Sequence, residues 1–196
     1  MKAFKRVTGR AAVLDRADVD TDQIIPKQFL KRIERTGYGE FLFFDWMKEP
    51  GFELRRPEFA GAQILLAGRN FGCGSSREHA TWALQDYGFD VVIAPSFGDI
   101  FRTNALKIGL VPIALEAEEV RALMQAAPLG PLTVDLEAQR ITAPDGRVVP
   151  FEFDPFAREC LLQGLDEIAL TLQRDGAITA FERSYSAPVD TTALPV

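Results

Sequence analysis

The chain has 196 residues, 47% of them hydrophobic and 26% charged, which is typical of a soluble globular protein with one sizeable core. No stretch approaches the roughly 18 continuous apolar residues that a membrane helix needs, and the N-terminal MKAFKRVTGR lacks the apolar run of a signal peptide, so we expect a cytoplasmic protein. The net charge of −6, with no Lys/Arg block longer than a pair, argues against nucleic acid and membranes as partners.

The N-terminal third predicts one strand and several irregular segments. Residues 3–14 alternate weakly and predict the strand, and an aspartate-rich loop over 18–22 follows. Residues 27–35 have helical spacing. The aromatic segment 41–46 favours a short helix or a buried loop, and the proline-containing segment 47–61 favours an irregular connection.

The middle of the chain alternates strands with helices, which predicts parallel strands joined by right-handed crossovers. The first of these strands is continuously apolar, as in a strand that is buried on both faces. The expected strands are 63–67, 91–94 and 110–114, and the expected helices are 77–87, 97–107 and 116–126.

In the C-terminal part, strands and helices no longer alternate. Segments 132–141 and 147–153 flank Pro144-Asp145-Gly146, which predicts a hairpin. Helices are expected over 155–163 and 165–182, with Gly164 between them and Gly176 interrupting the second.

These elements predict an α/β fold: a mostly parallel sheet flanked by helices, followed by a C-terminal hairpin and further helices. We expect a single domain over residues 1–185 and a flexible tail over 186–196.

A glycine-rich loop before the helix at 77–87 is the candidate site. Glycines such as Gly74 permit positive φ and close backbone approach, and the unpaired N–H groups of a helix N-terminus favour an anion. Ser75 and Ser76 add hydroxyls, and Arg77 can grip a carboxylate by two parallel hydrogen bonds. The loop therefore predicts a site for a small carboxylate.

The same loop does not match other common motifs. Its order of residues does not fit a phosphate loop, a dinucleotide loop or a nucleophile elbow, and a Ser-His-Asp triad is not expected from a single histidine. Two structural interpretations stay open: Ser75 or Ser76 caps the helix with Glu78 as capping partner, and His79 is a hydrogen-bonded structural imidazole.

Few residues of the chain suit a metal. It has one histidine, His79, and two cysteines, Cys73 and Cys160. Structural zinc sites take about four Cys or His ligands, and iron–sulfur clusters about three or four thiolates. We expect no metal site on this chain, and two reduced thiols rather than a disulfide.

Several motifs resemble the small subunit, or swivelling domain, of the aconitase superfamily. Residues 70–80, NFGCGSSREHA, resemble its signature, and 20–26, DTDQIIP, resemble its DTDxIxP motif. Residues 101–110 resemble its F-x-x-N-A…G-L segment. Segments 29–39 and 164–168 are similar to the isopropylmalate isomerase small subunits of bacteria, and the resemblance covers about residues 1–182.

The resemblance implies a β/β/α swivelling domain and a hydro-lyase reaction. In this family a serine, here Ser75, takes a proton from the carbon next to a carboxylate, and Arg77 binds a substrate carboxylate. Ser76 and Gly74 lie beside the substrate. The leaving hydroxyl is handled by a [4Fe–4S] cluster. Because this chain cannot hold that cluster, the resemblance implies a large partner subunit that does, and activity only in its presence.

Further residues of the matching motifs are expected to support the site. For the aspartate-rich loop, both buttressing of the active loop and contact with substrate stay open. The supporting residues are Asp20, Thr21, Asp22, Asn70, His79 and Asn104.

Substrate choice is expected to depend on the segment after Pro26. Leu30 and Ile33 are apolar and suit an isopropyl group, so the resemblance implies interconversion of 2-isopropylmalate and 3-isopropylmalate, small dicarboxylates of leucine biosynthesis. Arg32 and Arg35 could instead pair with a carboxylate or lie in solvent. A sister hydro-lyase acting on citraconate or homoaconitate and a non-catalytic carboxylate-binding module stay open as alternatives.

Overall fold

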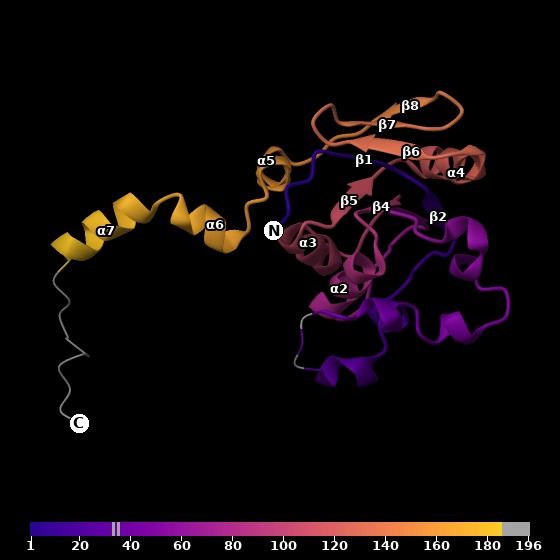
Figure 1. Cartoon of the computed structure of the whole chain (residues 1–196), viewed down its shortest axis with the longest axis horizontal. Coiled ribbons are helices and arrows are strands. Elements are labelled where there is room, and N and C mark those ends of the chain that lie inside the picture. Colours follow the sequence, from indigo (N-terminus) through magenta and orange to yellow (C-terminus); the bar gives the residue numbers. More distant parts are fainter. Residues whose placement is uncertain (33, 35, 186–196) are drawn as a thin grey trace.

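The computed structural model describes residues 1–32, 34 and 36–185, and its strands form two sheets (Figure 1). The first is fully parallel and has the order β2-β3-β4-β5. Its strands are β2 (Ala11–Leu14), β3 (Ile64–Ala67), β4 (Val91–Ala94) and β5 (Val111–Ala114). Every residue of β3 and β4 is buried, because both faces of this sheet are covered.

The second sheet is antiparallel and has the order β1-β6-β7-β8. It lies over one face of the parallel sheet, at the top of Figure 1. Its strands are β1 (Arg6–Gly9), β6 (Leu132–Asp135), β7 (Arg140–Thr142) and β8 (Val148–Pro150).

Alternation along β3 shows how the layers pack. Ile64 and Leu66 belong to the apolar cluster shared with the antiparallel sheet, α4 (Ala117–Ala126) and α5 (Pro155–Gln163). Leu65 and Ala67 belong to the opposite cluster, shared with α2 (Glu78–Tyr87) and α3 (Asp99–Ile108). The body is therefore a β/β/α arrangement, as expected. No helix in the described part of the chain is long and apolar enough to cross a bilayer.

The connection from β2 to β3 contains short helical turns around buried aromatic rings. Phe43 stacks on Trp46 with ring centroids 5.4 Å apart, and the guanidinium of Arg16 lies 4.4 Å from the Trp46 ring. Arg16 also makes a two-bond ion pair with Glu53. The turns are α1 (Thr21–Ile24), η1 (Lys27–Lys31), η2 (Gly39–Phe41), η3 (Trp46–Lys48), η4 (Glu53–Arg55) and η5 (Pro57–Phe59); η6 (Ala127–Leu129) follows α4.

The single strand expected over residues 3–14 is wrong, because the chain changes sheets there. β1 pairs with β6, and β2 pairs with β3. The carbonyl of Arg10 accepts hydrogen bonds from Gln63 and Ile64, and a Cβ at Gly9 would lie 2.5 Å from the Gln63 side-chain oxygen. A residue without a side chain at position 9 permits this switch.

The helix expected over 27–35 is also wrong, since a 3-10 turn, η1, ends at Lys31. Phe29 stacks on Phe41 at 4.1 Å and Arg32 lies 5.1 Å from the same ring, so tertiary packing overrides the helical spacing. Residues 33 and 35 lie outside the described residues.

The C-terminal elements are more divided than expected. The segment 132–141 contains β6 and β7, and the hairpin is formed by β7 and β8. The interruption expected at Gly176 comes earlier, because the segment 165–182 forms α6 (Glu167–Leu172) and α7 (Asp175–Ser184), and Gly176 lies inside α7. The break comes at Arg174, whose N–H donates to the carbonyl of Thr171 in a tight final turn.

Candidate functional site

The loops that follow β2 and β3 meet at the carboxyl edge of the parallel sheet, where α/β folds generally bind ligands. The N–H of Gly72 donates to the carbonyl of Val19 at 2.7 Å, and the N–H of Thr21 donates to that of Cys73 at 2.9 Å. The Thr21 hydroxyl donates to the carbonyl of Ser75 at 2.9 Å. The aspartate-rich loop and the glycine-rich loop are therefore one hydrogen-bonded unit.

The glycine-rich loop needs unusual backbone angles. Asn70, Gly72 and Gly74 have φ of 56°, 73° and 91°. A Cβ at Gly72 would lie 2.2 Å from the ring of Phe101, so this position requires glycine for space as well as for φ.

Asn70 fixes the start of the loop through two residues that sequence reasoning missed. Its N–H donates to the Ser96 hydroxyl and its side-chain amide donates to Asp18, both at 2.9 Å. Asp18 also pairs with Arg69 at 3.2 Å. Asp18 and Ser96 follow β2 and β4, the neighbours of β3, so their positions at strand ends were the available signal.

The two serines are exposed and neither caps α2. The N-cap is Arg77, and it makes no side-chain capping bond. Among the described residues, neither the Ser75 nor the Ser76 hydroxyl has a hydrogen-bond partner. The capping interpretation is therefore wrong, and both hydroxyls are available beside the first turn of α2.

Arg77 is held by a carboxylate of this chain. Its guanidinium forms a two-bond ion pair with Asp22, in which Nη2 lies 2.6 Å from Oδ2. Nη1 also donates to the carbonyl of Ile25 at 3.4 Å, and only 13% of the Arg77 side chain is exposed. The arginine expected to grip a substrate carboxylate is thus already oriented by an internal one.

The first aspartate of the loop has a different contact. Asp20 caps α1: its carboxylate accepts from the N–H of Gln23 at 2.8 Å, and the Gln23 side chain accepts from the N–H of Asp20 at 2.9 Å. Asp20, Thr21 and Asp22 therefore all contact other residues of this chain, which favours the buttressing interpretation.

His79 lies in the first turn of α2 among aromatic rings. Its centroid is 4.6 Å from Trp82 and 5.2 Å from Tyr38, and it has no hydrogen bond to a described residue. Burial lowers the pKa of His79, the charge of Arg77 lowers it further, and Glu78 acts in the opposite direction. His79 is thus an imidazole packed among aromatic rings rather than the hydrogen-bonded one expected.

Asn104 lies on α3 and lines a cavity of about 280 Å³ between α2 and α3, together with Glu78, Trp82 and Lys107. It is 7% exposed, and its side-chain nitrogen has no partner among the described residues. No hydrogen bond joins Asn104, among the described residues, to the glycine-rich loop 68–76, which carries Ser75 and Ser76 and is called the serine loop below.

The apolar residues expected to read the substrate are only partly described. Leu30 is half-buried against the core, and Ile33 and Arg35 lie outside the described residues. Arg32 pairs with Glu34 at 3.6 Å and with Glu40 at 3.5 Å. The charge of Arg32 is therefore balanced within this chain.

Family models cover most of the sequence. A model of the aconitase C-terminal domain matches residues 1–118, and one described as LeuD_N matches 118–155. A third, for the C-terminal domain of the 3-isopropylmalate dehydratase small subunit, matches 167–187. A 3-isopropylmalate dehydratase small subunit from Geobacillus kaustophilus is 56% identical over 193 residues, 94% of this chain and 98% of that protein. The chain belongs to the 3-isopropylmalate dehydratase small-subunit family.

Other relatives support the same family assignment. A small subunit from Bacillus licheniformis is 56% identical over 195 residues, 95% of this chain and 98% of that protein. The crystal structure of a 3-isopropylmalate dehydratase chain from Methanocaldococcus jannaschii matches with a TM-score of 0.68 and 28% identity, covering 89% of this chain and 98% of that chain. The expected aconitase-type fold, hydro-lyase class and small-subunit family are confirmed, and a small subunit implies a large one.

The dehydratase family also raises the question of the iron–sulfur cluster. Over residues 1–32, 34 and 36–185, no group of three or more His, Cys, Asp or Glu side chains is placed to hold a metal ion. Cys73 and Cys160 are free thiols. Burial raises the pKa of Cys73, and the charges of Asp20 and Asp18 raise it further, which disfavours the thiolate that a cluster needs. The described residues of this chain do not fit the cluster.

Proposed function

We propose that this chain is the small subunit of a 3-isopropylmalate dehydratase that interconverts 2-isopropylmalate and 3-isopropylmalate in the cytoplasm, as a step of leucine biosynthesis. The observation that carries the proposal is the serine loop of a chain in this family: two exposed hydroxyls stand next to a bidentate arginine at the start of α2. Such an arrangement can bind a carboxylate and move a proton beside it.

Ser75 acts as the base in this proposal. A serine hydroxyl is a weak base unless the environment stabilises its alkoxide. The free N–H groups of the first turn of α2 supply positive potential at this place, and Arg77, although paired with Asp22, adds N–H donors beside it. Ser75 then takes the proton from the carbon next to the substrate carboxylate and returns it in the hydration step.

Arg77 binds the substrate carboxylate, and Ser76 and Gly74 line the same place. Asp22 and the Ile25 carbonyl take three of the five guanidinium N–H groups, so the substrate carboxylate binds the side that carries Nε–H and the remaining Nη2–H. Because Asp22 already orients the guanidinium, little entropy is lost in ordering it. Asp22 is a positioning residue here, and Asp20 and Thr21 hold the two loops together.

The other half of the chemistry belongs to the large subunit, which carries the [4Fe–4S] cluster in this proposal. Bound there, the cluster would supply Lewis-acid chemistry toward the hydroxyl that leaves. This chain supplies proton transfer and carboxylate binding, so the active site forms between the two subunits and neither chain is active alone.

The apolar surroundings of Leu30 support an isopropyl substituent on the substrate. Leu30, like Phe29 and Phe41, is a partly buried residue that packs against the core. An aliphatic group gains from such burial, whereas an extra carboxylate there would lose its hydration.

Reconstitution tests the proposed function. The chain is mixed with the large subunit of the same organism, with its cluster reconstituted anaerobically, and ultraviolet absorbance of the unsaturated intermediate is followed from 3-isopropylmalate. We expect turnover in the mixture and none with either chain alone. A mixture that assembles but turns over only citraconate or homoaconitate would refute the substrate, and chains that do not associate would refute the heteromeric enzyme.

A further inference from the structure

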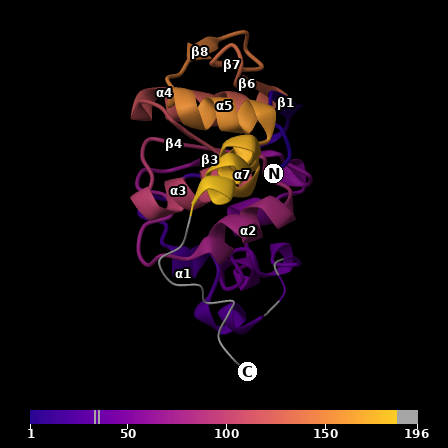
Figure 2. The same cartoon turned by 90° about the vertical axis from the view of Figure 1, so that its left-hand side faces the viewer.

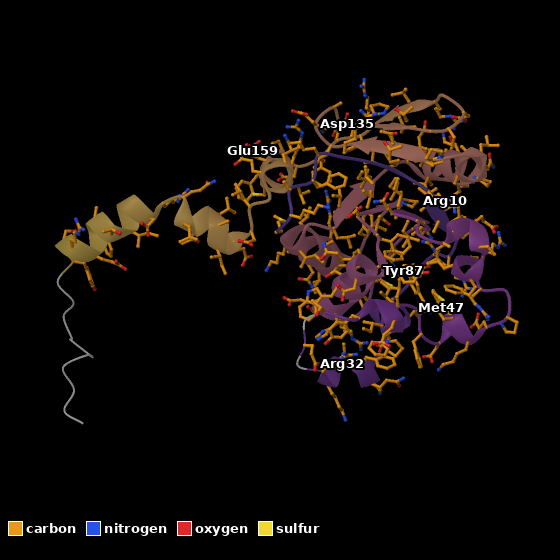
Figure 3. The ribbon with its side chains drawn as sticks, in the orientation of Figure 1. Arg10, Arg32, Met47, Tyr87, Asp135 and Glu159 are labelled. Atoms are coloured by element: carbon orange, nitrogen blue, oxygen red, sulfur yellow. The ribbon has the colours of Figure 1, made fainter. Side chains whose placement is uncertain are left out.

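The two C-terminal helices form an arm that leaves the body of the molecule. We call residues 166–185 the C-terminal arm; it contains α6 and α7, at the left of Figure 1 and in front of the body in Figure 2. No residue of α6 or α7 is buried. Figure 3 shows their side chains standing clear of the body. The arm is thus an ordered segment without a covering layer in the described chain.

The arm nevertheless exposes large apolar side chains. Ile168, Leu172, Phe181 and Tyr185 are 73%, 62%, 61% and 55% exposed. Phe181 and Tyr185 stack with ring centroids 5.2 Å apart, one helical turn from each other. An apolar stripe of this kind on a protruding helix marks an interaction surface.

The root of the arm is fixed to the body. The N-terminal ammonium of Met1 pairs with Asp166 at 2.9 Å, and Lys107 on α3 pairs with Glu167 at 3.2 Å. Asp166 also caps α6 by accepting from the N–H of Ala169 at 2.8 Å. The arm therefore leaves the body in a defined direction.

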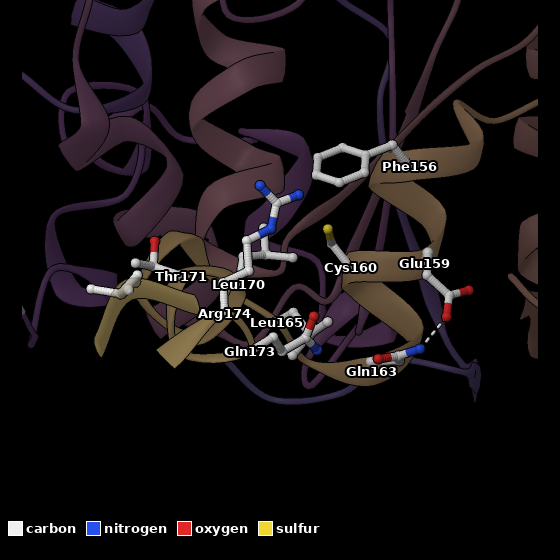
Figure 4. Close-up of a pocket in the computed structure, with 10 residues that line it drawn as sticks. Phe156, Glu159, Cys160, Gln163, Leu165, Leu170, Thr171, Gln173 and Arg174 are labelled. Carbon is white, nitrogen blue, oxygen red and sulfur yellow. Dashed lines mark hydrogen bonds between the residues drawn. The ribbon is translucent and has the colours of Figure 1, made fainter. Parts of the chain in front are cut away.

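A groove lies between the arm and α5 (Figure 4), with a volume of about 650 Å³. Its apolar lining includes Phe156, Leu165, Leu170 and Ile178, and Phe156 is 66% exposed. Polar side chains also line the groove, and the Arg174 side chain reaches across it toward Phe156. This is enough space for several apolar side chains of a partner.

The arm needs a partner to be stable. Isolated helices shorter than about 12–15 residues are marginal in water, and α6 and α7 have 6 and 10 residues. The burial that would stabilise them is not provided by the described body, since neither helix has a buried residue.

We propose that the arm and its groove form a docking surface for the large subunit, which places apolar side chains against Phe181, Leu172 and the groove. This inference rests on the proposed function for the identity of the partner. Stable interfaces bury about 800 Å² on each side, and one helical stripe supplies only part of that area. The arm is then an extension of a larger interface, and the large subunit must already contact this chain to complete the serine site.

A second copy of the chain fits less well. The family model that covers the arm is specific to small subunits, and it is separate from the aconitase domain model that covers residues 1–118. The arm therefore belongs to the part of the chain that distinguishes a detached small subunit.

The experiment compares Phe181→Asp with the matched control Ala180→Asp. Both residues are on α7 and neither is buried, and their side chains point about 100° apart around the helix. The free full-length chains should therefore unfold at similar temperatures. We expect Phe181→Asp to raise the Kd for the cluster-loaded large subunit at least about tenfold, as for a central interface aromatic, and Ala180→Asp to change it less than about threefold.

Turnover at saturating large subunit separates this inference from the proposed function. For Phe181→Asp we expect kcat close to that of the wild-type complex, because the serine loop is unchanged. An unaltered Kd for Phe181→Asp in an active, assembling pair would overturn the arm proposal alone. Loss of self-association of the chain with unaltered affinity for the large subunit would also overturn it, in favour of a second copy.

Discussion

The ion pair between Asp22 and Arg77 joins residues that are 55 positions apart in the chain. The Asp22 side chain is 53% exposed, so the pair is expected to contribute no more than about 1 kcal/mol to folding stability. Its effect should instead be on the direction of the guanidinium, and hence on substrate binding.

We therefore predict that Asp22→Asn raises KM about tenfold and changes kcat less than about threefold, because it removes positioning but not the base. Steady-state kinetics of the assembled complex measures both. Asp45→Asn, which removes the exposed partner of Lys48 at 2.9 Å, is the matched control and should leave KM unchanged. An equal loss in kcat for Asp22→Asn would show that Asp22 takes part in the chemical step.

The ion pair of Glu53 should make folding stability depend on pH. Burial acts to raise the pKa of Glu53, but the hydrogen bonds and charge of Arg16 outweigh it and hold the pKa below its ordinary value. Because the folded-state pKa is lower than the unfolded one, the stabilisation is present above the unfolded pKa of about 4.3 and is lost as pH falls through the folded pKa.

We predict that the free energy of unfolding of the wild type falls more steeply between about pH 5 and pH 3 than that of Glu53→Gln. Denaturant titrations at several pH values would measure this difference. Parallel curves for the two proteins would mean that the ion pair with Arg16 does not persist in solution.

At the scale of elements, the turn from β3 into α2 depends on Gly72. An alanine there would have its Cβ 2.2 Å from the Phe101 ring and would also keep a φ of 73°. Gly146 in the β7–β8 hairpin has a φ of 87° with open space around it. An alanine at this position would therefore show the free-energy cost of the positive φ without a steric clash.

We predict that Gly146→Ala costs about 1 kcal/mol of unfolding free energy, and Gly72→Ala about 3 kcal/mol, because the second adds overpacking. Chemical denaturation measures both. If Gly72→Ala is too unstable to purify, the double variant Gly72→Ala/Phe101→Ala should be only about 1 kcal/mol less stable than Phe101→Ala, since the clash is gone and the backbone cost remains. Equal costs at the two glycines would contradict the role of Phe101.

The elements that could be predicted from sequence are those whose burial repeats regularly. β3, β4 and α2 have continuous or periodic apolar residues, and their observed bounds lie within about one residue of the expected ones. The segment around Phe29 and Phe41 could not be predicted, because stacking between distant rings decides its conformation. The change of sheet near Gly9 depends on contact with Gln63, far along the chain.

The candidate site also contains residues that could be identified from the sequence and residues that could not. Ser75 and Arg77 could be identified from one continuous motif, because the loop and helix that carry them are local. Asp18 and Ser96 had only their positions at strand ends as a signal, because their contacts with Asn70 arise when the strands lie side by side. The pairing of Asp22 with Arg77 likewise needs the two loops to meet.

At the scale of the whole molecule, the chain presents two incomplete features. The serine loop offers proton transfer and carboxylate binding at the carboxyl edge of the parallel sheet, without a metal site among the described residues. The C-terminal arm offers an apolar stripe and a groove beside α5. Both are accounted for if the chain works only in a complex with the large subunit.

The most direct test of the proposed chemistry is the turnover of a complex assembled with Ser75→Ala. We predict that kcat falls by about 10²–10⁴, the usual contribution of a positioned base, while the Kd for the large subunit stays unchanged. Thr8→Ala, which removes an exposed hydroxyl on β1, should match the wild type in both quantities. A kcat for Ser75→Ala within about threefold of the wild type would contradict the assignment of Ser75 as the base.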